Sequence, residues 1–278
     1  MGVWSIQPPT YALAAVAALY VLGGRGRVGT RHRQARELGR SAAFWGALAT
    51  LLVAFDSPID DLADRSFAMH MTQHVLLLTV APPLLALAAP WARIWRPFPL
   101  AFRRTVARGL VVDPRARAVR AAASWLVQPA VVWLLFCGNL VAWHVPAAYD
   151  LTLRSALVHE GEHALFLATG LLFWLQVIPS PPFHTRLGEV SRALYTLAAM
   201  GVGWVLAIVL AFARQPLYTP YAQLAHRPGG LSALGDQQVA AGVMWVPGSL
   251  AFGLAVVLLL VRFIAPVGAQ PLTPSLER

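Results

Sequence analysis

Long apolar runs, separated by arginine-rich segments, constrain the fold of this chain more than any other feature. Of its 278 residues, 58% are hydrophobic and only 12% are charged, whereas a soluble domain carries about 25% charged residues. The apolar residues form continuous runs of bilayer length, not the periodic patterns of amphipathic helices or half-buried strands. The sequence therefore predicts an all-α polytopic membrane helix bundle that forms one domain over residues 1–278.

Seven runs are candidates for transmembrane helices, and the first two lie near the lower length limit for a bilayer span. The predicted spans cover residues 9–23, 41–55, 67–90, 123–143, 157–178, 190–213 and 238–264. The first run lacks the basic region and the cleavage site of a secretory signal, so we expect it to be retained as a helix. Pro82 and Pro83 should kink the third span, and neighbouring helices can satisfy the carbonyl groups that they free.

The arginines indicate an orientation. All 22 basic residues are arginines, and they lie between the apolar runs. The positive-inside rule places the arginine-rich segments 24–40 and 91–122 in the cytoplasm, and the acidic connection 56–66 suits an outer loop. Seven spans then put the N-terminus outside and the C-terminus in the cytoplasm. The net charge of +10 follows from this topology, so no nucleic-acid partner is expected.

Two histidine pairs, His70/His74 and His159/His163, lie within predicted spans. A spacing of four puts both rings of a pair on one helical face, about 6 Å apart along the axis. Ionisable side chains at membrane depth are costly and mostly mark ion, proton or cofactor sites. The third and fifth spans both start from the outer side, so both pairs lie near that face. Because imidazole suits copper, zinc and iron, the repeated spacing predicts a metal or cofactor site.

Two further side chains are expected at the same level of the membrane. Asp236 opens the seventh span, either as a plain N-cap or as an additional ligand or proton partner. His144 closes the fourth span, either as an interfacial residue or as a third source of imidazole. Tyr218 and Tyr221, in the loop before the seventh span, cap the site or lie at the membrane interface.

Soft ligands are also available near this level. Thioether sulfur suits Cu(I), although methionine in an apolar helix more often only packs. The methionines in question are Met69, Met71 and Met244. Cys137 is the only cysteine, so no intrachain disulfide forms.

The second pair lies within HEGEH, which matches the H-E-x-x-H motif of zinc metalloproteases. In an intramembrane zinc protease Glu160 would be the general base, but this hypothesis leaves His70 and His74 without a role. Alternatively, Glu160 and Glu162 form a solvated helix start, or Glu162 orients a ligand imidazole. The histidines are also compatible with a haem-binding electron carrier that takes one axial histidine from each pair, and with a scaffold whose histidines bind nothing.

Four segments together resemble the CtaG-type cytochrome c oxidase assembly proteins. They are SPIDDLADRSFAMHMTQHVLLLTVAPPLLALAAP, WHVPAAYDLTL, LVHEGEHALFLATGLLFW and GDQQVAAGVMW, in order from about residue 56 to 250. The resemblance implies a multi-span protein of the bacterial plasma membrane that helps to build copper-containing terminal oxidases. The extra acids in HEGEH depart from the family pattern and leave the metal and its charge balance open.

The resemblance also implies which residues form the site. The family pattern has counterparts of both histidine pairs, of the histidine in W-H-x-P and of the D-Q pair. Here these are His70, His74, His159, His163, His144, Asp236 and Gln237. We expect the four paired histidines to bind copper at the outer side, with Asp236 and His144 as secondary ligands and with zinc or haem in place of copper as the less favoured choices. The expected role is assembly and not catalysis, with terminal oxidase subunits or copper chaperones as partners within the lipid bilayer.

Overall fold

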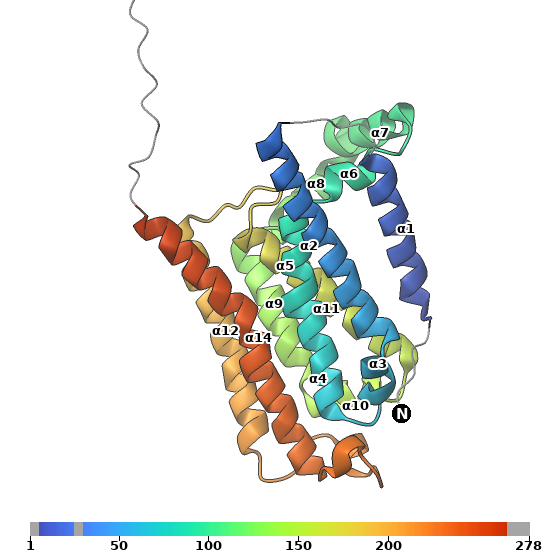
Figure 1. The fold of residues 1–278 in the computed structure, drawn as a ribbon, viewed down its shortest axis with the longest axis vertical. Coiled ribbons are helices and arrows are strands. Elements are labelled where there is room, and N and C mark those ends of the chain that lie inside the picture. Colours follow the sequence, from blue (N-terminus) through green and yellow to red (C-terminus); the bar gives the residue numbers. More distant parts are fainter. Residues whose placement is uncertain (1–5, 25–29, 266–278) are drawn as a thin grey trace, which may run out of the picture.

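The computed structural model of the chain describes residues 6–24 and 30–265. The regular structure of these residues is helical, and their only extended pairing is an isolated bridge between Ser180 and Phe183. Figure 1 shows the long helices side by side, roughly along one axis, with short helices at both ends of the bundle. The all-α prediction is confirmed for this part of the chain.

The long helices alternate in direction along the bundle axis (Figure 1). They are α1 (Pro8–Gly23), α2 (Arg31–Asp56), α4 (Phe67–Val75) continued by the π-helical turn η1 (Leu76–Val80) and α5 (Ala81–Ala88), α9 (Pro129–Trp143), α11 (Ala156–Val177), α12 (Glu189–Phe212) and α14 (Ala233–Ile264). As a result, α4, α11 and α14 start at the same end of the bundle. The histidine pairs, which open two of these helices, are therefore at similar depth.

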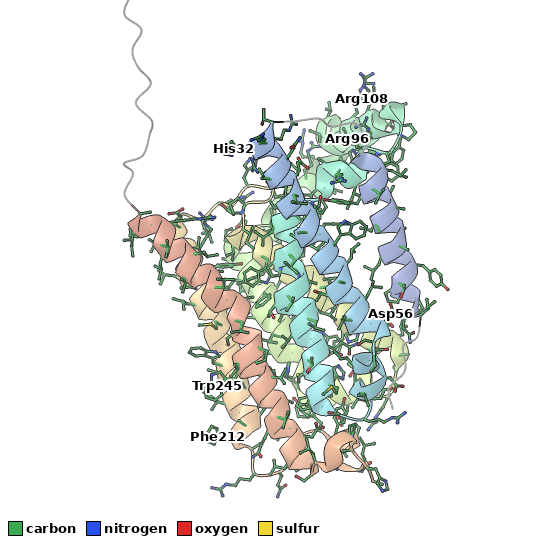
Figure 2. All side chains as sticks on the ribbon, viewed as in Figure 1. His32, Asp56, Arg96, Arg108, Phe212 and Trp245 are labelled. Carbon is green, nitrogen blue, oxygen red and sulfur yellow. The ribbon has the colours of Figure 1, made fainter. Side chains whose placement is uncertain are left out.

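Short helices close both ends of the bundle. At the end where α4 starts lie α3 (Pro58–Ala63), α10 (Pro146–Thr152) and α13 (Thr219–Ala222), followed by the 3-10 turn η4 (Pro228–Gly230). At the opposite end lie α6 (Trp91–Trp95), α7 (Leu100–Ala107), η2 (Arg108–Val112), η3 (Pro114–Ala116) and α8 (Arg117–Leu126). Figure 2 shows Arg96 and Arg108 at this second end, which is the arginine-rich one.

Four helices are long and apolar enough to cross a membrane. They are α2, the continuous α4–α5 segment Phe67–Ala88, α12 and α14, and the bent pair α8–α9 makes a fifth if it counts as one span. α1 has only 16 residues, and α11 begins with the polar HEGEH segment, so neither is in this set. The polytopic membrane character is confirmed, whereas the count of seven spans and the outward N-terminus stay predictions.

Two predicted helix boundaries are wrong. α2 begins at Arg31 and not at residue 41, because alanine, arginine, glutamine and glutamate favour the helix beyond the apolar run. The predicted span 123–143 is broken into α8 and α9, which are bent by 69°. Pro129, at the start of α9, lacks an amide hydrogen and disfavours helical geometry in the residue before it, so the chain turns there. Residues 25–29 of the predicted cytoplasmic loop lie outside the described residues.

The third span shows how prolines are accommodated inside the bundle. Pro82 would leave the carbonyl of Leu78 without its helical donor, and Trp174 of α11 donates from Nε1 to that oxygen at 3.0 Å. Gly170 of α11 faces the same turn, where a Cβ atom would lie 3.1 Å from Pro82 Cγ and 3.2 Å from Leu78 O. The predicted rescue of a freed carbonyl by a neighbouring helix is confirmed, and it holds α11 tightly against α4–α5.

Candidate metal centre

The two histidine pairs meet where α4 and α11 face each other. His70 Nε2 and His74 Nε2 are 2.9 Å apart on α4, and the rings of His159 and His163 on α11 have centroids 4.2 Å apart. Between the helices, the ring centroids of His70 and His159 are 4.9 Å apart, and those of His74 and His163 are 5.6 Å apart. This is the convergence that the spacing and the shared starting side of the two helices predict.

The start of α4 is fixed by a residue from α14. Ser66 precedes α4, and its hydroxyl donates to Asp236 Oδ1 at 2.7 Å. The backbone amide of Phe67 donates to Asp236 Oδ2 at 2.7 Å. Asp236 therefore caps α4 and not its own helix, which is capped by Ser232. Both of its carboxylate oxygens have this structural role, and its role as an additional ligand stays a prediction.

Four side chains bring ligand atoms close enough together for one ion. They are His70, His159, Glu162 and His163, and one ligand atom from each lies within 4.8 Å of the others. Atoms bound to one transition-metal ion at about 2.0–2.2 Å can be at most about 4.4 Å apart. That limit applies to two ligands on opposite sides of an ion, and tetrahedral ligands lie about 3.3–3.6 Å apart. The group would therefore have to contract, by about an ångström for its widest pair, to surround an ion tetrahedrally. We call these four residues the His/Glu cluster.

Glu162 makes the cluster well suited to a cation. Its side chain is fully buried, and neither carboxylate oxygen has a hydrogen-bond partner. Its carboxylate oxygens lie 3.5 Å from His70 Nε2 and 3.6 Å from His74 Nε2. The Nε2 atoms of His159 and His163 are buried without partners as well. A buried carboxylate is costly unless a positive charge compensates it, and three imidazoles with one carboxylate suit copper, zinc or iron.

Tyr221 of α13 sets the tautomer of His70. Its hydroxyl donates to the carbonyl of Ala63 at 2.5 Å and lies 3.1 Å from His70 Nδ1. Burial raises the pKa of Tyr221 well above its ordinary value, so the hydroxyl keeps its only proton for Ala63. His70 Nδ1 must therefore donate to the tyrosine oxygen, which leaves the lone pair on Nε2 facing the cluster. Of the two expectations for Tyr221, the capping role is the one that its contacts support.

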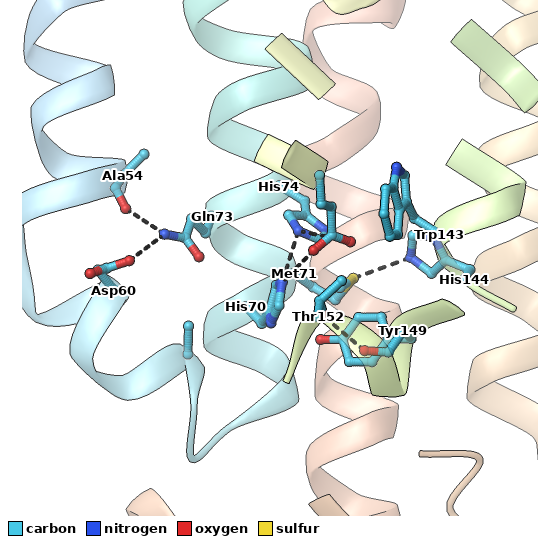
Figure 3. A network of polar contacts seen from close by, with 12 residues as sticks. Ala54, Asp60, His70, Met71, Gln73, His74, Trp143, His144, Tyr149 and Thr152 are labelled. Carbon is cyan, nitrogen blue, oxygen red and sulfur yellow. Dashed lines mark hydrogen bonds and ion pairs between the residues drawn. The ribbon is translucent and has the colours of Figure 1, made fainter. Parts of the chain in front are cut away.

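His74 and His144 lie beside the cluster and not within its four-atom group. His74 borders it through the 2.9 Å contact to His70. His144, just after α9, bonds through Nδ1 to the carbonyl of Leu140 at 2.7 Å, and its Nε2 lies 3.3 Å from Met71 Sδ. Figure 3 shows the contact between Met71 and His144 next to His70 and His74. Metal binding by all of these residues stays a prediction.

A second polar contact anchors α4 behind the histidines. Gln73, between the two ligand positions of α4, donates from Nε2 to the carbonyl of Ala54 at 2.7 Å and to Asp60 Oδ1 at 2.8 Å (Figure 3). These bonds tie α4 to α2 and α3. Burial raises the pKa of Asp60 to about 6, although the bond from Gln73 opposes this shift.

The geometry does not favour the zinc-protease hypothesis. Its general base would be Glu160, which is exposed and is not part of the His/Glu cluster. The acid that faces the histidines is Glu162, three residues after His159 and therefore on the same helical face. That spacing was a usable signal, although the sequence led us to expect only an orienting role for Glu162. The role of Tyr221 had no such signal, because its contact with His70 joins residues 151 positions apart.

Most of the chain matches one known protein family. The family model for the cytochrome c oxidase caa3 assembly factor (CtaG) covers residues 18–265. The chain belongs to this family. The match includes α4 and α11 and every residue of the His/Glu cluster, and it confirms the resemblance seen in the sequence.

The individual relatives found are distant in sequence, at 22–23% identity. An uncharacterized protein of Mycobacterium leprae is 23% identical over 270 residues, which cover 94% of this chain and 39% of the relative. An uncharacterized protein of Mycobacterium bovis is 22% identical over 254 residues, which cover 88% of this chain and 37% of the relative. The chain therefore spans less than two fifths of the length of these relatives. No solved structure matches it.

Proposed function

We propose that this protein binds copper at the His/Glu cluster and assists the maturation of a terminal oxidase in the bacterial plasma membrane. Its membership of the cytochrome c oxidase caa3 assembly factor family supports the assembly role. The observation that carries the metal site is Glu162, a buried carboxylate without a hydrogen-bond donor that lies in one cluster with two buried imidazole nitrogens without partners.

The arrangement of the cluster favours a bare ion over haem. An axial pair of histidines must leave the whole porphyrin plane free between the two rings. Here a third imidazole and the Glu162 carboxylate occupy the space between the paired histidines, with all four ligand atoms within 4.8 Å of one another. Glu160, the general base of the protease hypothesis, is exposed and lies outside this group. We therefore propose a role in binding and delivery and not in catalysis.

Release of the ion is compatible with this ligand set. Neutral imidazoles bind a metal reversibly, since protons and competing ligands displace it. The cluster also lies at the end of the bundle closed by the short helices α3, α10 and α13 (Figure 1). The proposed partners are terminal oxidase subunits or copper chaperones that exchange the ion at this end. In the predicted topology, this end faces the outside.

Metal analysis of the purified protein tests the proposal. Wild type should contain copper, and the double variant His159→Ala/His163→Ala should lose it, because half of the cluster's ligands are removed. The control variant is His32→Ala/His184→Ala, which changes two exposed histidines outside the cluster. Equal copper, zinc and iron contents in the wild type and the cluster variant would show that the cluster does not bind the metal.

A cellular assay tests the assembly role separately. Deletion of the gene should lower the copper content and activity of the terminal oxidase, and wild type should restore both. The His159→Ala/His163→Ala variant should reach the membrane at normal levels without restoring them. Full restoration by that variant would show that the assembly role does not require the His/Glu cluster.

A further inference from the structure

A second pair of potential ligand atoms lies next to the His/Glu cluster. Met71 follows His70 on α4 and is fully buried. Its Sδ atom is 3.3 Å from Nε2 of His144, at the end of α9. Figure 3 shows this contact on the side of α4 that faces His144. The function proposed above uses neither atom.

The contact between Met71 Sδ and His144 Nε2 is not a hydrogen bond. A carbonyl oxygen only accepts, so the 2.7 Å bond to Leu140 O places the proton of His144 on Nδ1. A neutral imidazole then carries a lone pair on Nε2, and a buried charged ring at membrane depth is costly. A thioether sulfur also carries lone pairs and no hydrogen. Two electron-pair donors therefore face each other with no proton between them.

We propose that Met71 Sδ and His144 Nε2 are two ligands of a second site, which takes a soft monovalent cation such as Cu(I). Thioether and imidazole donors together favour Cu(I) over harder divalent ions. With metal–nitrogen and metal–sulfur distances of about 2.0 and 2.3 Å, a 3.3 Å separation between the two atoms gives an angle of about 100° at the ion. This angle is close to tetrahedral, so the pair is already arranged for shared coordination.

A cavity beside this pair supplies room and further soft ligands. Its volume is about 50 Å³, and it lies among α4, α9, α12 and α14. On the same measure, one water molecule needs about 10–15 Å³. Met71 and His144 line the cavity together with Met200 and Met244. Three thioethers and the imidazoles of His144 and His74 thus line one mainly apolar cavity, and the two additional methionines are the candidate further sulfur ligands.

His74 connects this cavity with the His/Glu cluster. It lines the cavity, and its Nε2 is 2.9 Å from His70 Nε2 and 3.6 Å from Glu162 Oε1. Because His70 Nε2 carries a lone pair, the hydrogen between the two rings lies on His74 Nε2. Once that proton moves, an ion held by Met71 and His144 can pass to the cluster by ligand exchange through this imidazole, with no change of oxidation state. This route rests on the proposed function of the cluster, whereas binding at Met71 does not.

Anaerobic titration of the purified full chain with Cu(I), against a chromogenic Cu(I) chelator, tests the second site. Wild type should bind one ion more than Met71→Leu, and copper X-ray absorption should show a sulfur ligand that Met71→Leu lacks. Met69→Leu is the matched control, a half-buried methionine of the same helix, and it should keep both the ion and the sulfur signal. Exchange of methionine for leucine preserves volume and is well tolerated.

His144→Gln is a second variant, which should lose the same ion and keep Zn(II) binding at the cluster. A sulfur signal that persists in Met71→Leu, or wild type that binds Cu(I) without sulfur, would overturn the second site and leave the cluster unaffected. Conversely, loss of one ion in Met71→Leu with none lost in His159→Ala/His163→Ala would support the second site and contradict the proposed function of the cluster.

Discussion

Glu162 is the residue whose surroundings decide what the cluster can hold. Its charge is buried, and both of its oxygens lack hydrogen-bond donors. Most buried acids are neutralised by a proton or by a basic partner. The imidazoles of His70 and His74, 3.5 and 3.6 Å away, neutralise Glu162 only when they are protonated. A bound cation would satisfy the carboxylate and the unpartnered imidazoles at once.

The variant Glu162→Gln tests whether the negative charge of this side chain contributes to metal binding. Ligand binding stabilises the folded state by about 2.7 kcal/mol at a free metal concentration of about 100 Kd. We expect wild type to show such a gain in thermal unfolding when metal is added, and Glu162→Gln to show a much smaller one because an anionic ligand is lost. Glu160→Gln, an exposed acid two residues away, should keep the full gain. An equal gain in Glu162→Gln and wild type would contradict this role.

Among the helices, α4 most affects the geometry of the cluster, and its start depends on another helix as well as on its own N-cap residue Ser66. Asp236 of α14 accepts from Ser66 and from the amide of Phe67, and this sets the position of His70 one turn later. Gln73 ties the same helix to α2 and α3. The position of the first histidine pair therefore depends on contacts between helices.

Asp236→Asn should destabilise the protein by about 1.5–3 kcal/mol, the range for hydrogen bonds to charged groups. Ser232→Ala, which removes the cap of α14, should cost about 1 kcal/mol. Unfolding in mixed micelles measures both values. Metal content per folded chain should stay near that of wild type, because the side-chain amide oxygen still accepts a hydrogen bond from the start of α4 and keeps His70 in position. Loss of metal at unchanged stability would instead identify Asp236 as a ligand.

The burial of Asp60 in α3 should make stability depend on pH. Burial raises the pKa of Asp60 from 3.8 to about 6, so between these values the folded state holds a proton that the unfolded state has lost. Stability contributed by Asp60 is thus present below about pH 4 and falls as the pH rises to about 6. Asp60→Asn should make the midpoint of unfolding less dependent on pH over this range. An identical slope in wild type and Asp60→Asn would refute the assignment.

At the scale of the whole molecule, the helical membrane class and the meeting of the two histidine pairs were predictable from the sequence. The first follows from the length of the apolar runs, and the second from the spacing of four residues together with the shared starting side of the two helices. The break at Pro129 and the early start of α2 were missed, because both depend on local backbone preferences at the ends of apolar runs. The contacts of Tyr221 and Asp236 join residues distant in sequence, and no local pattern indicates such pairs.

The orientation of the bundle is a prediction for the molecule as a whole. Cys137 is the only cysteine and is buried, so Cys137→Ser provides a background for labelling. In that background, a membrane-impermeant maleimide should label Arg154→Cys, before α11, in intact cells. It should label Arg104→Cys, in α7, only after permeabilisation. Both positions are exposed, and the reverse pattern would place the His/Glu cluster on the cytoplasmic side.

The most direct test of the metal centre is to locate the ion in the copper-loaded protein, by anomalous diffraction at the copper edge. We predict an anomalous peak within bonding distance of His159 Nε2, His163 Nε2 and a carboxylate oxygen of Glu162, with His70 Nε2 as the fourth ligand. Copper-loaded crystals with no peak among these four side chains would contradict the account.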